Sequence, residues 1–324
     1  MIITFIVALI PVSAIYLLGC LGETTMEKAG HLNLGLPGIM CVGAAGACCG
    51  ISMYVQAIPN VADASWLVLI LLSLVCAMIF AALAGCIYAV LTVTLRCNQN
   101  IVGLALTTFG AGFSEFFIFG LDRNVRESLI PAASRIMQQG LPFAKDLGDF
   151  GAIFLSHNVV VYVAIALAVA LSLVFNRTRV GLHLRAVGEN PATADATGIN
   201  VTKYKYLAII VGSAIAGIGG MLYMIIPSSS GTFQNSLTLQ AMGWISLALV
   251  IFTLWRPLIS ILGSFVFGAL YICGTYLDVN VPVEFLNMLP YIVTIIVLIV
   301  TSILDSKRAQ PPASLGSNYF REER

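Results

Sequence analysis

The sequence contains little charge: Asp, Glu, Lys and Arg make up 10% of its 324 residues, and the formal net charge is +1. Soluble domains carry about 25% charged residues, which supply the polar surface that water requires. A chain with so small a share is not expected to be a soluble globular protein. The near-zero net charge also provides no attraction for a polyanion, so nucleic-acid binding is not expected either.

Motifs for catalysis and for binding metals or nucleotides are also missing. No Gly-x-x-x-x-Gly-Lys-Ser/Thr segment occurs, so this chain is not expected to hydrolyse ATP itself. The three histidines, at 31, 157 and 183, are dispersed, and the eight cysteines form no Cys-x-x-Cys pair. We therefore predict no enzyme activity, no catalytic residue, no metal site and no cofactor in this chain, and we expect the cysteines to be buried, reduced packing residues.

Hydrophobic residues, in contrast, make up 59% of the chain, and the mean hydropathy is +0.96. About 20 helical residues are needed to cross a bilayer. Runs of about this length predict an all-α integral membrane protein, a polytopic bundle of about nine spans. No Lys or Arg precedes the first run, so we expect a retained span there rather than a signal peptide. The runs lie at about 1–21, 34–55, 65–95, 101–121, 158–175, 207–226, 239–255, 258–276 and 289–304.

Basic residues fall unevenly on the two sides of the predicted bundle. Cytoplasmic loops carry an excess of Lys and Arg, so the richer side is expected to be cytoplasmic. This places the N-terminus outside and the C-terminus inside, with a cytoplasmic loop at 177–206 and an external loop at 122–157. We expect the external loop to form a surface helix. Inside would lie Lys28, Arg96, Arg177, Arg179, Arg185, Lys203, Lys205, Arg256, Lys307, Arg308, Arg321 and Arg324; outside would lie Arg123, Arg126, Arg135 and Lys145.

The cytoplasmic loop contains a predicted helix of about two turns, with both of its ends marked. Asn190 can cap the first free N–H groups, Pro191 suits the first helical position, and Gly198 permits a left-handed stop. Its side chains are mainly Ala and Thr, so it can bury little surface within its own chain. It is either an ordinary capped helix in a solvated loop or a helix that docks in a groove of another protein.

The residues around this helix favour docking. Residues 181–194 and 198–201 closely resemble the coupling-loop signature of ABC importer permeases of the ribose, nucleoside and branched-chain amino-acid type. The resemblance implies a type II ABC importer transmembrane domain whose loop docks on a partner ATPase, which binds the ATP and Mg. The residues that it assigns to ATPase coupling are Gly188, Glu189, Asn190, Pro191, Ala192, Ala194, Asp195 and Gly198.

A second informative stretch connects the first two apolar runs. Asn33-Leu34-Gly35-Leu36-Pro37-Gly38 is either a plain tight turn or an interrupted helix entry whose polar groups face a cavity. It resembles an Asn-Ile-Gly-Leu-Glu-Gly segment of nucleoside-type permeases, with Pro37 in place of the glutamate. Residues 243–258, with a Trp-x-Pro-Leu turn, resemble the same branch, in particular the shorter permease of nucleoside transporters that use a BMP-type binding protein. The resemblance implies that Asn33 and Gly35 lie along the translocation path.

Glu115 is the charged side chain that we find within the predicted spans. A carboxylate at helix depth costs about 2.5–3.5 kcal/mol unless it faces protein or water. Glu115 therefore lines the path near its outer mouth, reaches the interface, or pairs with an arginine of the external loop.

The resemblance also implies a function and partners. Residues 1–306 would form the permease domain, and 307–324 a short cytoplasmic tail that we expect to be disordered. The permease would import a small uncharged polar solute, nucleosides above all, with ribose-like sugars or riboflavin as alternatives. Its partners would be the ATPase, a homologous second permease chain, an external substrate-binding lipoprotein and the lipid of a bacterial inner membrane. An ion-coupled secondary transporter is the alternative from another class.

Overall fold

The computed structural model describes residues 2–140, 148–226, 233, 235–276, 283–304 and 310–320. These residues are almost entirely helical, as the long apolar runs predict. The long helices are α1 (Ile2–Glu27), α2 (Leu36–Ala57), α3 (Trp66–Ala89), α4 (Gln99–Phe119), α7 (Val159–Arg177), α10 (Val201–Ile225), α11 (Leu237–Phe252), α12 (Pro257–Tyr276) and α13 (Val283–Leu304). The shorter helices are α5 (Ile130–Met137), α6 (Gly148–Phe154), α8 (Arg179–Glu189) and α9 (Pro191–Ala196). Single turns η1 (Val61–Asp63), η2 (Val90–Thr94) and η3 (Val125–Leu129) join them.

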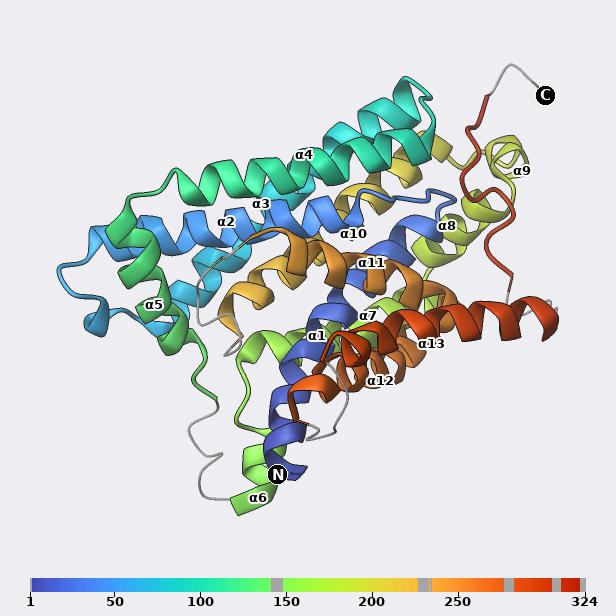
Figure 1. Ribbon diagram of the computed structural model, residues 1–324. Helices are drawn as coiled ribbons and strands as arrows, with labels where there is room; N and C mark the ends of the chain where they lie inside the picture. The colour runs from blue at the N-terminus through green and yellow to red at the C-terminus, as the bar shows by residue number, and fades with distance from the viewer. Residues whose placement is uncertain are drawn as a thin grey trace.

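The bundle has two ends. Helices α5 and α6 lie at one end together with the N-terminus, and α8 and α9 lie at the other together with the C-terminus (Figure 1). Seven helices of the described residues are long and apolar enough to cross a membrane. They are α1, α2, α3 continued by η2, α4, α7, α10 and α12, and α11 is a shorter apolar helix. The chain is therefore a multi-pass membrane protein.

Helices α2 and α10 form the centre of the bundle. Their most apolar windows are 83% and 89% buried, against 28–33% for α3, α4, α7 and α12. The centre packs closely because small residues let the backbones approach. A β-carbon added at Gly43 of α2 would lie 2.5 Å from Cα of Gly217 in α10, and one added at Gly220 would overlap the carbonyl oxygen of Met40. The small residues of α2 and α10 therefore form packing faces between these two helices.

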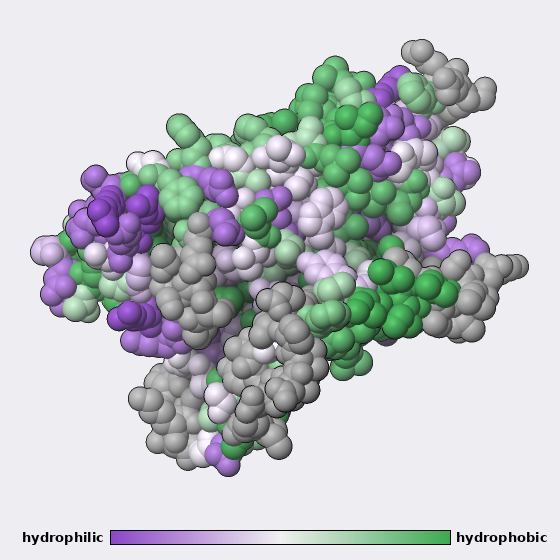
Figure 2. Space-filling view, in the orientation of Figure 1, coloured by the Kyte–Doolittle hydropathy of each residue, from purple (hydrophilic) through white to green (hydrophobic). Residues whose placement is uncertain are grey.

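The outer helices expose large apolar side chains, as a lipid-facing surface requires. Examples are Leu71 and Leu83 on α3, Phe109 and Phe116 on α4, and Leu262 on α12. In the space-filling view, hydrophilic residues gather toward the two ends and hydrophobic residues cover much of the length between them (Figure 2).

Two expectations about local structure were wrong, and that of buried cysteines was right only in part. Helix α1 runs to Glu27, so Glu23 and Glu27 are charged residue types within a spanning helix, and Glu115 does not stand alone. The external segment does form helices, but α5 contacts α2, α3 and α10 and buries Ile130 and Met137. Its hydrophobic inner face outweighs the polar residues on which the surface-helix prediction rested. Of the cysteines, Cys20, Cys41 and Cys48 are buried, whereas Cys49, Cys76, Cys86, Cys97 and Cys273 are half-buried.

Candidate functional site

The short helix predicted in the central loop is present, with the expected ends. Helix α9 begins at Pro191, and the side chain of Asn190 accepts a hydrogen bond from the backbone N–H of Thr193 at 3.0 Å. Gly198 follows with φ +86°, a left-handed conformation that suits glycine. Helix α8 precedes it and is capped by Thr178, whose hydroxyl accepts from the N–H of Gly181 at 3.2 Å. The caps thus hold a two-helix unit at the end of the bundle.

Helix α9 is attached by a small contact area. Ala194 is buried against Val187 of α8 and Val201 of α10, with Tyr319 packed beside them. Ala192, Thr193 and Ala196 are exposed. The helix therefore presents a face of small side chains, anchored from behind, which a larger protein can cover without displacing bulky groups.

The C-terminal segment 310–320 crosses this unit, so the prediction of a disordered tail is wrong for these residues (Figure 1). The backbone N–H of Ser314 donates to the carbonyl of Gly188 at 3.0 Å, and the N–H of Gly316 donates to the carbonyl of Gly30 at 3.3 Å. A β-carbon at Gly30 would lie 2.5 Å from the Ser314 hydroxyl, so the Ser314 side chain lies directly against the Gly30 backbone. The tail joins the end of α8 to the connection after α1.

The same segment reaches α9 and the start of α4. The hydroxyl of Tyr319 donates to Oδ2 of Asp195 at 2.9 Å. The side chain of Asn318 donates to the carbonyl of Arg96 at 2.6 Å, and Nε2 of Gln99 donates to the carbonyl of Ser317 at 3.4 Å. Asp195, one of the predicted coupling residues, is therefore tied through the tail to the bundle.

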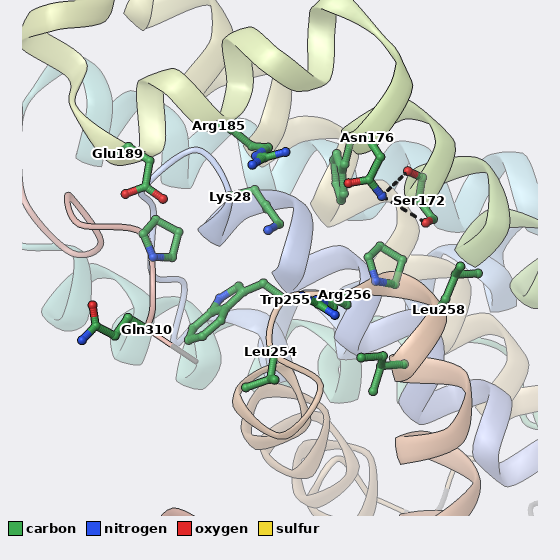
Figure 3. A pocket seen from close by; sticks show the side chains of 14 residues that line it. Lys28, Ser172, Asn176, Arg185, Glu189, Leu254, Trp255, Arg256, Leu258 and Gln310 are labelled. Atoms are coloured by element: carbon green, nitrogen blue, oxygen red, sulfur yellow. Dashed lines mark hydrogen bonds between the residues drawn. The ribbon is translucent and has the colours of Figure 1, made fainter. Parts of the chain in front are cut away.

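Basic residues that we assigned to one side lie together at the α8–α9 end. Lys28, Arg185 and Arg256 line a cavity of about 620 Å³, together with Glu189 (Figure 3). Arg96 and Lys205 line a second cavity of about 450 Å³, beside Asp195 and Tyr319. Burial lowers the pKa of Lys28, and the nearby charge of Arg185 lowers it further. This end of the molecule has a positive local charge despite the near-neutral chain.

His31 lies between the bundle and the second cavity. Its side chain is 1% exposed, in the connection between α1 and α2. Burial, with a further contribution from the charge of Lys205, lowers the pKa of His31 to about 3. The imidazole is therefore neutral throughout the physiological pH range.

The connection that carries Asn33 and Gly35 is a tight buried turn. Asn33 is 0% exposed; its Oδ1 accepts from the N–H of Gly35 at 2.9 Å, and its own N–H donates to Glu23 at 2.8 Å. Gly35 precedes α2 and packs against Leu106 of α4. In this conformation the Asn33 side chain holds the turn.

Glu115 lies at the opposite end from α9 and is half-buried. Its Oε1 accepts a hydrogen bond from the backbone N–H of Ser236, just before α11, at 2.9 Å. Among the described residues, the ion pairs are Arg123–Glu127 and Arg126–Glu127, so Glu115 forms none of them. The structure does not bring Glu115 together with Asn33 or with the α9 residues.

Sequence reasoning missed a buried pair of carboxyl groups on α1. Glu23 is 0% exposed and Glu27 is 2% exposed, one helical turn apart. The indole N–H of Trp255 donates to Oε2 of Glu27. Trp255 itself lies in the turn between α11 and α12 with φ +54°. Glu23 and Glu27 are four residues apart, a spacing that is typical of one helix face. Because both follow the predicted end of the first apolar run, the sequence places them in a loop instead.

These features describe a multi-pass membrane protein with one braced, positively charged end at which the short helix α9 is exposed. A family model described as "Branched-chain amino acid transport system / permease component" matches residues 5–298. The chain belongs to this family. It is the permease component of an ABC transporter, a transport subunit rather than an enzyme.

Three relatives align over nearly the whole chain. This chain is 31% identical to the "Nucleoside ABC transporter permease protein NupC" of Lactococcus lactis, and the alignment covers 94% of this chain and 92% of the relative. It is 31% identical to the "Putative glucose ABC transporter permease protein TsgC13" of Haloferax volcanii, covering 97% of each. The chain is 30% identical to the "Guanosine ABC transporter permease protein NupQ" of Bacillus subtilis, and the alignment covers 98% of this chain and 97% of the relative.

Proposed function

We propose that the protein is one permease subunit of an ABC importer and that α9 couples it to a partner ATPase. The observation that carries this proposal is the capped helix α9, with small side chains exposed and with its rear face braced by α8, α10 and the tail. A rigid helix of this kind can transmit movement of a bound ATPase to the bundle. Gly188, Glu189 and Pro191 set the direction in which α9 leaves α8. ATP and Mg belong to the partner, because this sequence has no phosphate-binding loop.

We further propose nine spans, with the N-terminus outside and the C-terminus inside. Helices α11 and α13 complete the set, and the two chain ends then lie on opposite sides, as they do in the bundle (Figure 1). The basic cluster at the α8–α9 end supports a cytoplasmic location for that end. The domain boundary predicted at 306 lies outside the described residues.

Labelling single cysteines in a variant without native cysteines tests this orientation. Ala196 of α9 is exposed, and the Arg123 side chain at the other end is 84% exposed. Ala133, also on the predicted outer side, is 0% exposed and is a poor labelling position. In intact cells, a membrane-impermeant thiol reagent should modify Arg123→Cys and spare Ala196→Cys. The reverse pattern rejects the orientation.

We propose nucleosides as the transported solutes. Two of the relatives are named as nucleoside or guanosine permeases. A solute without a strong charge also suits a bundle whose spans carry few ionised groups. Asn33 and Gly35 would act along the path in another conformation, and Glu115 near its outer mouth. A sugar is the second candidate, because a third relative is named for glucose; riboflavin is a further one.

Uptake by the assembled transporter decides between these solutes. The assembly would contain this chain, a homologous second permease, two ATP-binding domains and an external binding lipoprotein in a bacterial inner membrane. Uptake of a labelled nucleoside should require ATP and be blocked by unlabelled nucleosides. Robust uptake of ribose, glucose or riboflavin without any nucleoside uptake rejects the proposal that nucleosides are the transported solutes. Uptake driven by an ion gradient in vesicles without ATP would favour a secondary transporter.

A further inference from the structure

The cavity beside α8 gathers positive charge without a matching number of carboxylates. Lys28 after α1, Arg185 on α8 and Arg256 before α12 line it, and Glu189 is the acidic residue among its lining residues. None of the three cations belongs to an ion pair found among the described residues. Figure 3 shows Lys28 below Arg185, with Arg256 extending beneath them.

Holding these three cations together is unfavourable without an anion. Burial lowers the pKa of the half-buried Lys28, and repulsion from Arg185 and Arg256 lowers it further, whereas Glu189 acts in the opposite direction. A bound anion would reverse this repulsion and satisfy the fork of N–H groups on each arginine. Ser172, Asn176 and Gln310 on the wall add neutral hydrogen-bonding groups. The cavity therefore has the charge and donors of a site for a phosphate group.

A separate, apolar cavity lies on the same side of the bundle helices. It measures about 190 Å³ and is lined mainly by apolar residues of α1, α7 and α12, among them Leu17, Ile165 and Phe265. The same three helices contact one another and continue to the cationic cavity, where α7 contributes Phe175 and α12 contributes Leu258. From Ile165 to Phe175 the rise along α7 is about 15 Å.

The surface between the two cavities is apolar. Val169 and Leu173 of α7 are 43% and 56% exposed, and Leu262 of α12 is 70% exposed. A free phosphate would use the cations and none of this strip. An acidic peptide would leave the apolar cavity empty. A molecule with an anionic head and a hydrocarbon chain matches both parts, and basic pockets between spanning helices on the cytoplasmic side bind such headgroups.

We propose that α1, α7, α8 and α12 form a binding site for one anionic phospholipid. Its phosphate lies among Lys28, Arg185 and Arg256, and one acyl chain runs along α7 toward the apolar cavity. In the proposed orientation the headgroup belongs to the cytoplasmic leaflet. The bound lipid offsets part of the positive charge beside α8 and so helps to hold the base of the coupling helix. Binding does not depend on which solute is transported.

Native mass spectrometry of the assembled transporter tests the headgroup part. The complex is exchanged into detergent with equal amounts of dioleoyl phosphatidylglycerol and dioleoyl phosphatidylcholine. We expect retention of one phosphatidylglycerol per chain in preference to phosphatidylcholine. Arg185→Gln combined with Arg256→Gln should weaken it by about fivefold for each cation removed. Arg179→Gln is the matched control, because Arg179 is exposed on the same helix and does not line the cavity. Equal retention of the two lipids by the unmodified complex overturns the proposal, and so does a double variant that retains phosphatidylglycerol like the control.

Two further arms test the hydrocarbon part and the source of the phosphate. Ile165→Trp fills the apolar cavity, so it should reduce retention of the dioleoyl lipid while binding of dihexanoyl phosphatidylglycerol stays unchanged. Millimolar inorganic phosphate should not displace the dioleoyl lipid. Displacement by phosphate, or equal binding of the short and long lipids by the unmodified complex, would show an anion site without a lipid chain and would overturn the proposal.

Discussion

The centre of the bundle and its α8–α9 end are stabilised in different ways. Helices α2 and α10 approach until backbone touches backbone at Gly43 and Gly220, and their neighbours seal them from lipid. Helix α9 buries little and is held by its Asn190 cap, by the packing of Ala194 and by the hydrogen bond from Tyr319 to Asp195. The comparison shows that close packing of helix backbones stabilises the centre of the bundle, whereas a few polar contacts hold the proposed docking helix. Damage to the first region should prevent folding, and damage to the second should impair coupling in a folded protein.

The largest expected effect tests the close approach at the centre. Gly220→Leu would place side-chain atoms where the Met40 carbonyl of α2 lies, so α2 and α10 would have to separate. We expect a loss of about 3 kcal/mol or more of the free energy of unfolding, a large share of the stability of a folded domain, so the melting temperature should fall. Size-exclusion chromatography and thermal unfolding in detergent measure this.

Gly112→Ala is the control for that substitution. Gly112 is exposed on α4, and a β-carbon there would meet nothing within 4 Å. It should leave the melting temperature unchanged. A Gly220→Leu protein that melts like Gly112→Ala would show that the close contact at the centre is not needed.

A smaller effect is expected from the tail. Tyr319→Phe removes the hydrogen bond to Asp195 and should cost about 1 kcal/mol locally. We therefore expect faster amide exchange in residues 188–198, with little change in the melting temperature of the bundle. Hydrogen–deuterium exchange measured by mass spectrometry resolves the segment.

Tyr162→Phe is the matched control, because its hydroxyl donates to the carbonyl of Phe154 away from α9. Exchange in 188–198 that is equally slow in both variants would mean that the tail does not brace α9.

The last expected effect concerns the pH dependence of stability through His31. Its folded-state pKa of about 3 lies below the ordinary value of about 6.5, so the unfolded chain binds the proton more tightly. Stability from this group is complete above about pH 6.5 and falls as the pH drops toward 3. We expect His31→Gln to show a shallower decrease of melting temperature between pH 6.5 and pH 4 than the unmodified protein. His183→Gln, at a half-buried position, is the control and should keep the original slope; parallel curves for all three proteins would reject the assignment.

Local signals in the sequence were sufficient for the short helix. The Asn190 cap, Pro191 and Gly198 act within a few residues, so their pattern predicts α9 directly. The apolar runs likewise predict the long helices, because bilayer thickness fixes their length. The Gly and Ala residues of α2 and α10 permit close packing, but the sequence does not show which helix meets which.

Contacts between distant segments could not be predicted in this way. The tail looked like a polar terminus because Ser314 and Tyr319 find their partners, Gly188 and Asp195, more than 100 positions earlier in the chain. Glu27 is buried because Trp255 of a distant turn donates to it. Neither partner lies within the reach of periodicity or capping rules. The charged residues around α5 make the segment look polar, so the sequence does not predict that one face of α5 is buried in the bundle.

Coupling between ATP hydrolysis and solute tests the central claim most directly. In the reconstituted transporter, ATPase activity is measured with and without the loaded binding protein for the unmodified chain, for Asn190→Ala combined with Asp195→Lys, and for the control Arg179→Gln. The cap contributes about 1 kcal/mol, so the double variant should remain folded. We predict that it loses ATPase association and substrate stimulation, whereas the control keeps both. A folded double variant with unchanged association and unchanged stimulated hydrolysis would contradict the assignment of α9 as the coupling helix.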